Sequence, residues 1–239
     1  MEIVKLRFKP ENDSDFESKN LERFVEYAKN IFIKENIYDS GNFSEIFLSN
    51  DANSNICFKK IKPFVKPTND VWEEADFLNR VHSLSKNSDV MVPKPIFALK
   101  AMIKYNKDSR PIERQVIAMS FMDAYKMEDV IESKNNARLP DNFDVDKYFS
   151  SLRGFVQQMH NNGIYHADLF SRNIMIDKKT SAPVLIDFGE SRGESLDEKR
   201  DAYGRLKIED FYGREVLEDL DLKNIMTIEE DVRRMLTKL

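Results

Sequence analysis

The sequence is poor in the residues that mark several common protein classes. Cys57 is the only cysteine, so no disulfide can form within the chain, and only three histidines accompany it. One thiol and three imidazoles are too few for the usual zinc sites, and a chain without disulfides is typical of a reducing compartment. The chain has no apolar run near the roughly 20 residues that a membrane-spanning helix needs, and it begins without the apolar core of a signal peptide. We therefore expect a soluble, cytoplasmic protein, or one secreted into a host cell if it is a bacterial effector.

An excess of positive charge is also absent. The chain has 37 Lys and Arg residues against 42 Asp and Glu residues, which gives a net charge of −5. A general nucleic-acid binder normally presents a basic face, so we expect no nucleic-acid partner. With 239 residues, 41% of them hydrophobic, the chain is long enough for one or two compact units with a core.

A leading segment precedes the first clear strands. Apolar residues at helical spacing over 21–32 predict an amphipathic helix, and residues 2–8 predict a short strand before it. We therefore interpret residues 1–36 as an N-terminal helical extension. It either binds a partner or regulator, or packs on the main body of the protein, and we favour the second role.

The next part of the chain has the pattern of a small sheet with one helix. Two apolar runs within 43–61, joined by an Asn/Asp/Ser turn, predict a β-hairpin. Residues 71–84 place apolar side chains at helical spacing, with Asn69 or Asp70 as the N-cap. Two further apolar runs, within 91–103 and 114–122, predict strands. The order β-β-α-β-β indicates a mostly antiparallel sheet with one helix.

After Asp123 the pattern becomes helical. Apolar residues from Val145 to Met159 recur at spacings of three and four, and the pattern ends at Gly163. Two short apolar runs, within 173–177 and 182–188, then predict strands, and the chain has a helical pattern again from Leu196 onward. We therefore expect a small β-rich lobe followed by a helical lobe.

One stretch, GIYHADLFSRNIMIDKKTSAPVLIDFGES (163–191), places polar residues at the ends of apolar runs. These residues are Asp168, Asn173 and Asp187. An unpaired buried carboxylate is costly, so two carboxylates and an amide in such positions indicate a site for a cation or a polar substrate. Each residue could also be an ordinary turn, cap or strand-end residue, but three matched positions favour the site.

The same stretch resembles the catalytic and metal-binding loops of the protein kinase superfamily. The resemblance consists of His166-x-Asp168 followed by Asn173, and then of a strand leading to Asp187-Phe188-Gly189. It implies an α+β, bilobal protein kinase-like fold. Residues 37–122 would form a small β-sheet N-lobe with the helix called αC, and residues 123–239 a reduced helical C-lobe.

The resemblance implies a phosphotransferase that uses ATP and Mg²⁺, with a protein substrate or regulator as its partner. Asp168 matches the catalytic base, and Asn173 and Asp187 match the metal ligands. His166 is interpreted as a brace for the loop rather than as a base.

A lysine–glutamate pair that positions the α- and β-phosphates is also implied. Lys59 and Glu74 match it, and both are assigned to the catalytic set. Lys60 and Glu73 are the adjacent alternatives, and side-chain facing favours the first pair.

The predicted nucleotide-binding segments depart in part from the family pattern. Where the family has three glycines, the segment DSGNFSEI keeps only Gly41, so the backbone can approach phosphate closely at fewer points. Met119 matches the gatekeeper position before the hinge, although a methionine also suits an interior strand. The predicted ATP-binding residues are Gly41, Asn42, Phe43, Ser44, Lys59, Met119, Ser120 and Met122.

Three departures indicate an atypical branch of the superfamily. Ala167 replaces the arginine of the His-Arg-Asp motif, no Ala-Pro-Glu motif follows Gly189, and Phe170 stands where Ser/Thr kinases usually carry a lysine. The segments VPKPIFAL, YHADL and IDF resemble RIO-like kinases, from which LFSRN departs. Arg172 either replaces the missing lysine charge or is an ordinary solvated or ion-paired arginine.

Three functions are compatible with these features. We favour an ATP- and Mg²⁺-dependent atypical Ser/Thr protein kinase that lacks a full activation segment. A small-molecule kinase, similar to aminoglycoside, choline or lipopolysaccharide kinases, is the second, because an acidic protein suits a cationic substrate. The third is a pseudokinase-type binding module, since the glycine loop is eroded.

Overall fold

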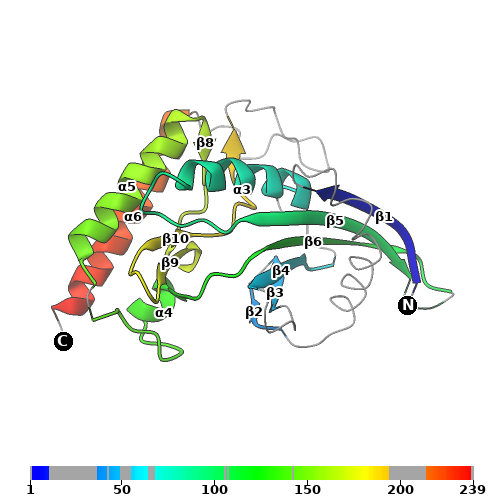
Figure 1. Cartoon of the computed structure of the whole chain (residues 1–239), viewed down its shortest axis with the longest axis horizontal. Coiled ribbons are helices and arrows are strands. Elements are labelled where there is room, and N and C mark those ends of the chain that lie inside the picture. The colour runs from blue at the N-terminus through cyan, green and yellow to red at the C-terminus, as the bar shows by residue number, and fades with distance from the viewer. Residues whose placement is uncertain are drawn as a thin grey trace. The chain divides into compact units, whose positions relative to one another are not determined.

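The computed structural model describes residues 2–10, 37–41, 43–48, 55–63, 68–104, 106, 108–141, 143–193 and 214–237. The chain divides into two compact units, and Figure 1 shows their helices and strands. The first unit comprises residues 1–79 and 93–121, and the second comprises residues 80–92 and 122–239.

One antiparallel sheet builds the first unit, with the strand order β1-β5-β6-β4-β3-β2. Its strands are β1 (Glu2–Pro10), β2 (Asp39–Ser40), β3 (Ser44–Leu48), β4 (Ile56–Ile61), β5 (Pro95–Lys104) and β6 (Ile112–Ser120). The predicted hairpin is confirmed, because β3 and β4 pair from Ser44 opposite Ile61 to Leu48 opposite Cys57. The predicted first strand is present and extends to Pro10, pairing with β5. The helix predicted over 21–32 lies outside the described residues.

Alternating side chains of this sheet form its core. In β5 the side chains of Phe97, Leu99, Ala101 and Ile103 are buried, as expected because alternate residues of a strand face the same side. A cluster of buried apolar side chains joins four strands: Phe47, Phe58, Phe97, Leu99, Val116 and Ala118. Burying each large side chain of this kind stabilises the fold by about 1.5–3 kcal/mol.

The helix α3 (Val71–Ser85) begins at a capping box. Asp70 Oδ1 accepts hydrogen bonds from the backbone N–H groups of Trp72 at 2.8 Å and Glu73 at 3.1 Å, and Glu73 Oε2 accepts one from Asp70 N–H at 3.0 Å. Asp70, rather than Asn69, is therefore the N-cap. Lys100 of β5 pairs with Asp70 Oδ2 at 2.6 Å and lies over the Trp72 ring, which ties the start of α3 to the sheet.

Two long helices form much of the second unit. The helix α5 (Val145–Asn161) begins at Asp144, whose carboxylate accepts a hydrogen bond from Lys147 N–H, and it ends before Gly163, which has a φ of 65°. The helix α6 (Arg214–Leu236) lies beside α5 in Figure 1. Its buried side chains recur at spacings of three and four: Leu217, Asp221, Ile225, Ile228 and Val232. No helix among the described residues is long and apolar enough to cross a membrane.

Short strands complete the second unit. They are β7 (Ala124–Lys126), β8 (Ile164–Tyr165), β9 (Ile174–Asp177), β10 (Pro183–Leu185) and β11 (Arg192–Gly193), with α4 (Met127–Ile131) and the 3₁₀ turn η1 (Ser171–Asn173). The sheets are β10-β9-β7 and β11-β8. Both strands predicted after α5 are confirmed, as β9 and a shorter β10. The sequence did not predict β7, because three residues are too few to show a period.

The segment that follows α3 belongs to the second unit because it joins the edge of β10. Met91 forms a parallel bridge with Val184, and its N–H donates to the Pro183 carbonyl oxygen at 2.8 Å. Its own carbonyl oxygen accepts a hydrogen bond from Leu185 N–H at 3.0 Å.

Candidate active site

In the first unit, a lysine and a glutamate form a buried ion pair. Lys59 Nζ, from β4, lies 2.6 Å from Glu74 Oε1, in the first turn of α3. The two side chains are only 7% and 3% exposed. Burying two charges is favourable only when each has a well-placed partner. The pair therefore holds an ammonium group in a fixed position.

Their neighbours in sequence have other partners. Lys60 Nζ lies 2.9 Å from Glu45 Oε2 and 4.5 Å from the centre of the Phe47 ring. Glu73 takes part in the capping box of α3. The structure thus brings together Lys59 and Glu74, the pair that side-chain facing favoured.

In the second unit, two neighbouring side chains fix the carboxylate of Asp168. Its Oδ1 accepts a hydrogen bond from Arg172 Nη2 at 2.7 Å, and its Oδ2 accepts one from Asn173 Nδ2 at 2.7 Å. Asn173 Nδ2 also donates to the carbonyl oxygen of Asp168 at 2.8 Å. Because the amide nitrogen of Asn173 makes both contacts, its amide oxygen is left to accept a hydrogen bond or bind a cation.

Partial burial changes the acidity of Asp168. Burial raises the pKa of its carboxyl group, and the Arg172 guanidinium opposes that rise without cancelling it. A carboxylate with a raised pKa binds a proton more readily than an ordinary aspartate. This property suits a general base.

His166 connects the Asp168 loop to the segment that carries Asp187. Its ring is fully buried, with Nε2 3.0 Å from the Ile186 carbonyl oxygen and the ring centre 4.9 Å from that of Phe188. A hydrogen bond to a carbonyl oxygen requires that Nε2 carry the proton. The contacts agree with the interpretation of His166 as a brace.

Asp187 lies beside Asn173 at one end of the β9–β10 pair. Ile186 N–H donates to the Asn173 carbonyl oxygen at 3.1 Å, which brings the next residue, Asp187, close to Asn173. Asp187 has a φ of 65°, a left-handed conformation that aspartate tolerates better than most residues. Its Oδ1 accepts a hydrogen bond from Gly189 N–H at 3.3 Å. Such strained positions are common at functional sites.

These oxygen donors fit a magnesium ion. Mg²⁺ prefers one or two carboxylate or amide oxygens and fills its other positions with phosphate oxygens and water. Asp187 and Asn173 offer a carboxylate and an amide oxygen from neighbouring positions. Among the described residues, no group of three or more His, Cys, Asp or Glu side chains could hold a metal ion. The donors present therefore suit an ion that binds together with a nucleotide.

Asp221 of α6 is a site residue that the sequence did not reveal. Its buried Oδ2 accepts a hydrogen bond from His166 N–H at 2.9 Å and lies 3.0 Å from His160 Nε2, while its Oδ1 accepts one from Ala167 N–H at 3.1 Å. Ala167 has a φ of 62°, which is unfavourable for a residue with a Cβ atom. The Asp221 carboxylate therefore holds the loop before Asp168 in a strained conformation.

A comparison with known protein families shows the family of this chain. The family described as "Protein kinase domain" matches residues 33–224, which is most of the chain. The chain belongs to the protein kinase domain family. The kinase fold expected from the sequence is thereby confirmed.

Curated relatives match shorter parts of this kinase domain. The probable cell division control protein 7 homologs 1 and 2 of Encephalitozoon cuniculi (strain GB-M1) are each 33% identical over 95 residues, or 40% of this chain. A probable bifunctional tRNA threonylcarbamoyladenosine biosynthesis protein of Methanosphaera stadtmanae is 31% identical over 85 residues, or 36% of this chain. The aligned part covers 26% of each of the first two relatives and 14% of the third. The chain thus spans about a quarter or less of the curated relatives it matches.

The kinase domain's glycine loop is described in part. Gly41 follows β2 and donates a backbone hydrogen bond to the Ser44 carbonyl oxygen at 3.0 Å. A Cβ atom added to Gly41 would meet nothing within 4 Å. Phe43 is 47% exposed, whereas Ser44 is buried at the start of β3. Asn42 lies outside the described residues, and an ATP-binding role for this segment stays a prediction.

The predicted gatekeeper and hinge residues lie at the end of β6. Met119 is 9% exposed and pairs with Cys57 and Pro95 on the two neighbouring strands, so it occupies an interior strand position. Ser120 N–H donates to the Lys94 carbonyl oxygen at 2.8 Å. Since that donor is already bonded to the residue before β5, adenine recognition by backbone donors would depend on later residues such as Met122.

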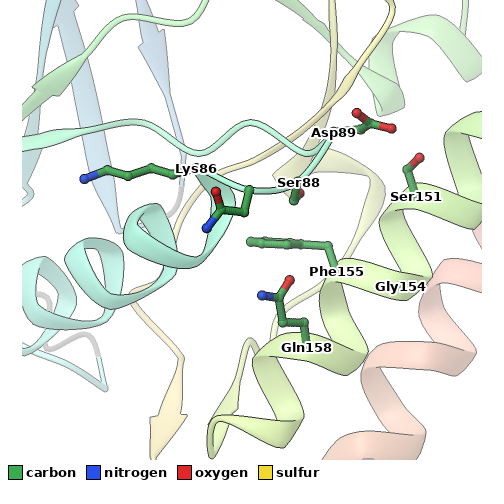
Figure 2. A pocket seen from close by; sticks show the side chains of 8 residues that line it. Lys86, Ser88, Asp89, Ser151, Gly154, Phe155 and Gln158 are labelled. Carbon is green, nitrogen blue, oxygen red and sulfur yellow. The ribbon is translucent and has the colours of Figure 1, made fainter.

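A cavity of about 460 Å³ lies elsewhere in the second unit. Figure 2 shows the Phe155 ring of α5 in this cavity, between Ser88 and Gln158. Asp168, Asn173 and Asp187 do not line it. The cavity is therefore separate from the kinase motif residues.

Proposed function

We propose that this protein is an atypical Ser/Thr protein kinase that transfers the γ-phosphate of ATP to a hydroxyl group of a protein substrate. The fixing of Asp168 between Arg172 and Asn173, beside Asp187, carries this proposal. Phosphoryl transfer depends on positioning and on charge neutralisation more than on covalent chemistry by the protein. A partly buried base next to two oxygen ligands meets both needs.

Each residue then has a role that follows from its contacts. Asp168 accepts or orients the proton of the attacking hydroxyl. Asn173 and Asp187 hold Mg²⁺, which would neutralise phosphate charge when bound. Lys59, kept in place by Glu74, binds the α- and β-phosphates.

The assignment to an atypical branch rests on Ala167 and on the residues after Gly189. An alanine has no side chain that could bind a phosphorylated activation segment, and no Ala-Pro-Glu motif follows Gly189. We therefore propose a RIO-like kinase without a full activation segment. The single, buried cysteine agrees with a protein that acts in the reducing environment of the cytoplasm.

The test is phosphotransfer by purified protein incubated with ATP, Mg²⁺ and a mixture of protein substrates, followed by intact-mass and peptide mass spectrometry. We expect phosphate on Ser or Thr with the wild type and none with Asp168→Asn or Asp187→Asn. The matched control is Asp123→Asn, because the Asp123 side chain is 70% exposed and pairs only with a surface lysine in the described contacts. Transfer by Asp187→Asn at the wild-type rate would contradict the proposal.

The same protein preparation distinguishes the two other functions. Consumption of ATP only when an aminoglycoside or amino alcohol is present would indicate a small-molecule kinase, which the net charge of −5 makes plausible for cationic substrates. Failure to bind ATP–Mg²⁺ in calorimetry would indicate a pseudokinase-type module, in agreement with the loss of two loop glycines.

A further inference from the structure

A cation and an exposed aromatic ring lie next to Asp168 in the second unit. Arg172 Cζ lies 4.6 Å from the centre of the Phe170 ring. Phe170 is 42% exposed, and the Arg172 side chain is 51% exposed. Arg172 helps to fix the base Asp168 through one of its N–H groups, and Phe170 has no part in the roles of base, metal ligand or phosphate-binding lysine. An aromatic ring exposed to this extent beside a catalytic base therefore needs an explanation of its own.

The guanidinium of Arg172 has hydrogen-bonding capacity to spare. A guanidinium group carries five N–H donors in a planar fork, and within the described part of the chain that of Arg172 donates only to Asp168 Oδ1. Half of the side chain is exposed, so the other donors are accessible from solvent. Stacking on Phe170 restricts the guanidinium, and this lowers the entropy lost when it binds a further group.

The position of Arg172 limits what that group can be. Its Nη2 lies 2.7 Å from Asp168 Oδ1, so a group on the guanidinium lies close to any hydroxyl held by Asp168. The planar fork matches the two oxygens of a carboxylate. The chain as a whole is acidic, with a net charge of −5. Arg172 would therefore attract an acidic segment locally, without a general basic surface around it.

We propose that the Phe170–Arg172 pair binds an acidic side chain next to the acceptor hydroxyl, so that the kinase selects Ser or Thr residues in acidic protein segments. The inference rests on the proposed function and adds its substrate class. Arg172 receives the carboxylate, and the Phe170 ring packs against the aliphatic part of the same substrate segment.

The test uses three peptides of equal length that contain one Ser flanked by Glu, Gln or Lys residues. The measured quantity is the ratio of kcat/KM between peptides, which is independent of any general loss of activity in a variant. We expect the wild type to prefer the Glu peptide over the Lys peptide by about tenfold in kcat/KM. This factor corresponds to a charge-assisted hydrogen bond that is weakened because solvent screens the exposed arginine. Arg172→Gln should remove this preference, and Arg172→Glu should reverse it.

Lys178→Glu is the matched control. Lys178 is also a cation that lies over an aromatic ring, 4.8 Å from the centre of Tyr125, and it also pairs with an aspartate, Asp123. The substitution changes the charge of the second unit by the same amount as Arg172→Glu. We expect Lys178→Glu to keep the wild-type preference.

Two results would overturn the inference. One is an equal kcat/KM for all three peptides with the wild type. The other is an equal loss for all three peptides with Arg172→Gln, which would limit Arg172 to fixing Asp168 or binding the transferred phosphate, with no contact to an acidic side chain of the substrate.

A binding measurement separates this inference from the proposed function. Fluorescence polarisation of labelled Glu and Lys peptides needs no turnover. If no peptide is phosphorylated, the proposed function fails, but tighter binding of the Glu peptide by the wild type than by Arg172→Gln still supports the acidic surface. Equal binding of both peptides by the wild type contradicts it.

Discussion

At the scale of single residues, we expect the Lys59–Glu74 pair to affect both stability and activity. Both side chains are nearly inaccessible, so removing the lysine alone leaves a carboxylate buried without its ammonium partner. We expect Lys59→Met to lower the free energy of unfolding by about 3–5 kcal/mol. In the double variant Lys59→Met/Glu74→Leu, two apolar side chains replace the pair, and most of that loss should be recovered because replacing a buried ion pair by apolar residues is often neutral.

Activity should respond differently from stability. The double variant keeps the packing but has no ammonium group for phosphate, so phosphotransfer should be lost in both variants. Urea unfolding followed by fluorescence gives the stability, and peptide phosphorylation gives the activity. A double variant as unstable as the single one would show that Lys59 acts through something other than its pairing with Glu74.

At the scale of secondary-structure elements, Asp70 controls the start of α3, the helix that carries Glu74. Burial would raise the pKa of Asp70, but Lys100 and the backbone N–H groups of Glu73 and Trp72 outweigh it, so the pKa is lower than usual. An aspartate with a lowered pKa stabilises the folded state above its unfolded pKa of about 4, and this contribution is lost as the pH falls through the folded-state value. Asp70→Ala should therefore cost about 1 kcal/mol at neutral pH.

The pH dependence provides the check on this cap. The difference in unfolding free energy between wild type and Asp70→Ala should be constant from pH 6 to 7 and should shrink below about pH 4. Urea unfolding at several pH values measures it. Asp70→Asn is the companion variant, because an asparagine still caps the helix but has no charge to titrate. A difference that grows as the pH falls would exclude a charged Asp70 as the stabilising cap.

At the scale of the whole molecule, one carboxylate ties the C-terminal helix to the catalytic loop. Asp221 accepts the backbone N–H groups of His166 and Ala167, 55 and 54 residues earlier in the chain. Each buried N–H group left without an acceptor costs about 1–3 kcal/mol. Asp221→Ala should therefore lower the free energy of unfolding by about 2–6 kcal/mol, the sum of two such losses.

Catalysis should suffer beyond the loss of stability, because Ala167 would no longer be held in its left-handed conformation next to Asp168. The measurement is kcat at a temperature where circular dichroism shows that the variant is folded. Asp219→Ala, an exposed aspartate on the same helix, is the control and should behave as the wild type. A folded Asp221→Ala variant with wild-type kcat would show that the loop keeps its geometry without α6.

Much of the fold and part of the candidate site could be predicted from the sequence because they depend on local patterns. Side-chain alternation predicted β4 and favoured Lys59 over Lys60, and apolar residues at spacings of three and four predicted α5. The spacing of Asp168, Asn173 and Asp187 along the chain resembled that of a kinase site. The strand and the helix depend on residues within a few positions of each other, and local geometry sets them.

Other features were decided only by the tertiary structure. Three of them join segments that are far apart in the chain. They are the pairing of β1 with β5, the pairing of β7 with β9, and the hydrogen bond from Ala167 N–H to Asp221. A local pattern shows that a segment can form a strand or a buried helix face. It does not show which distant segment will pair with that strand or pack on that face. The sequence by itself therefore determined the longer elements and most of the residues that could do chemistry. The folded chain determined which of those residues meet, because buried polar groups must find partners and those partners lie far away in sequence.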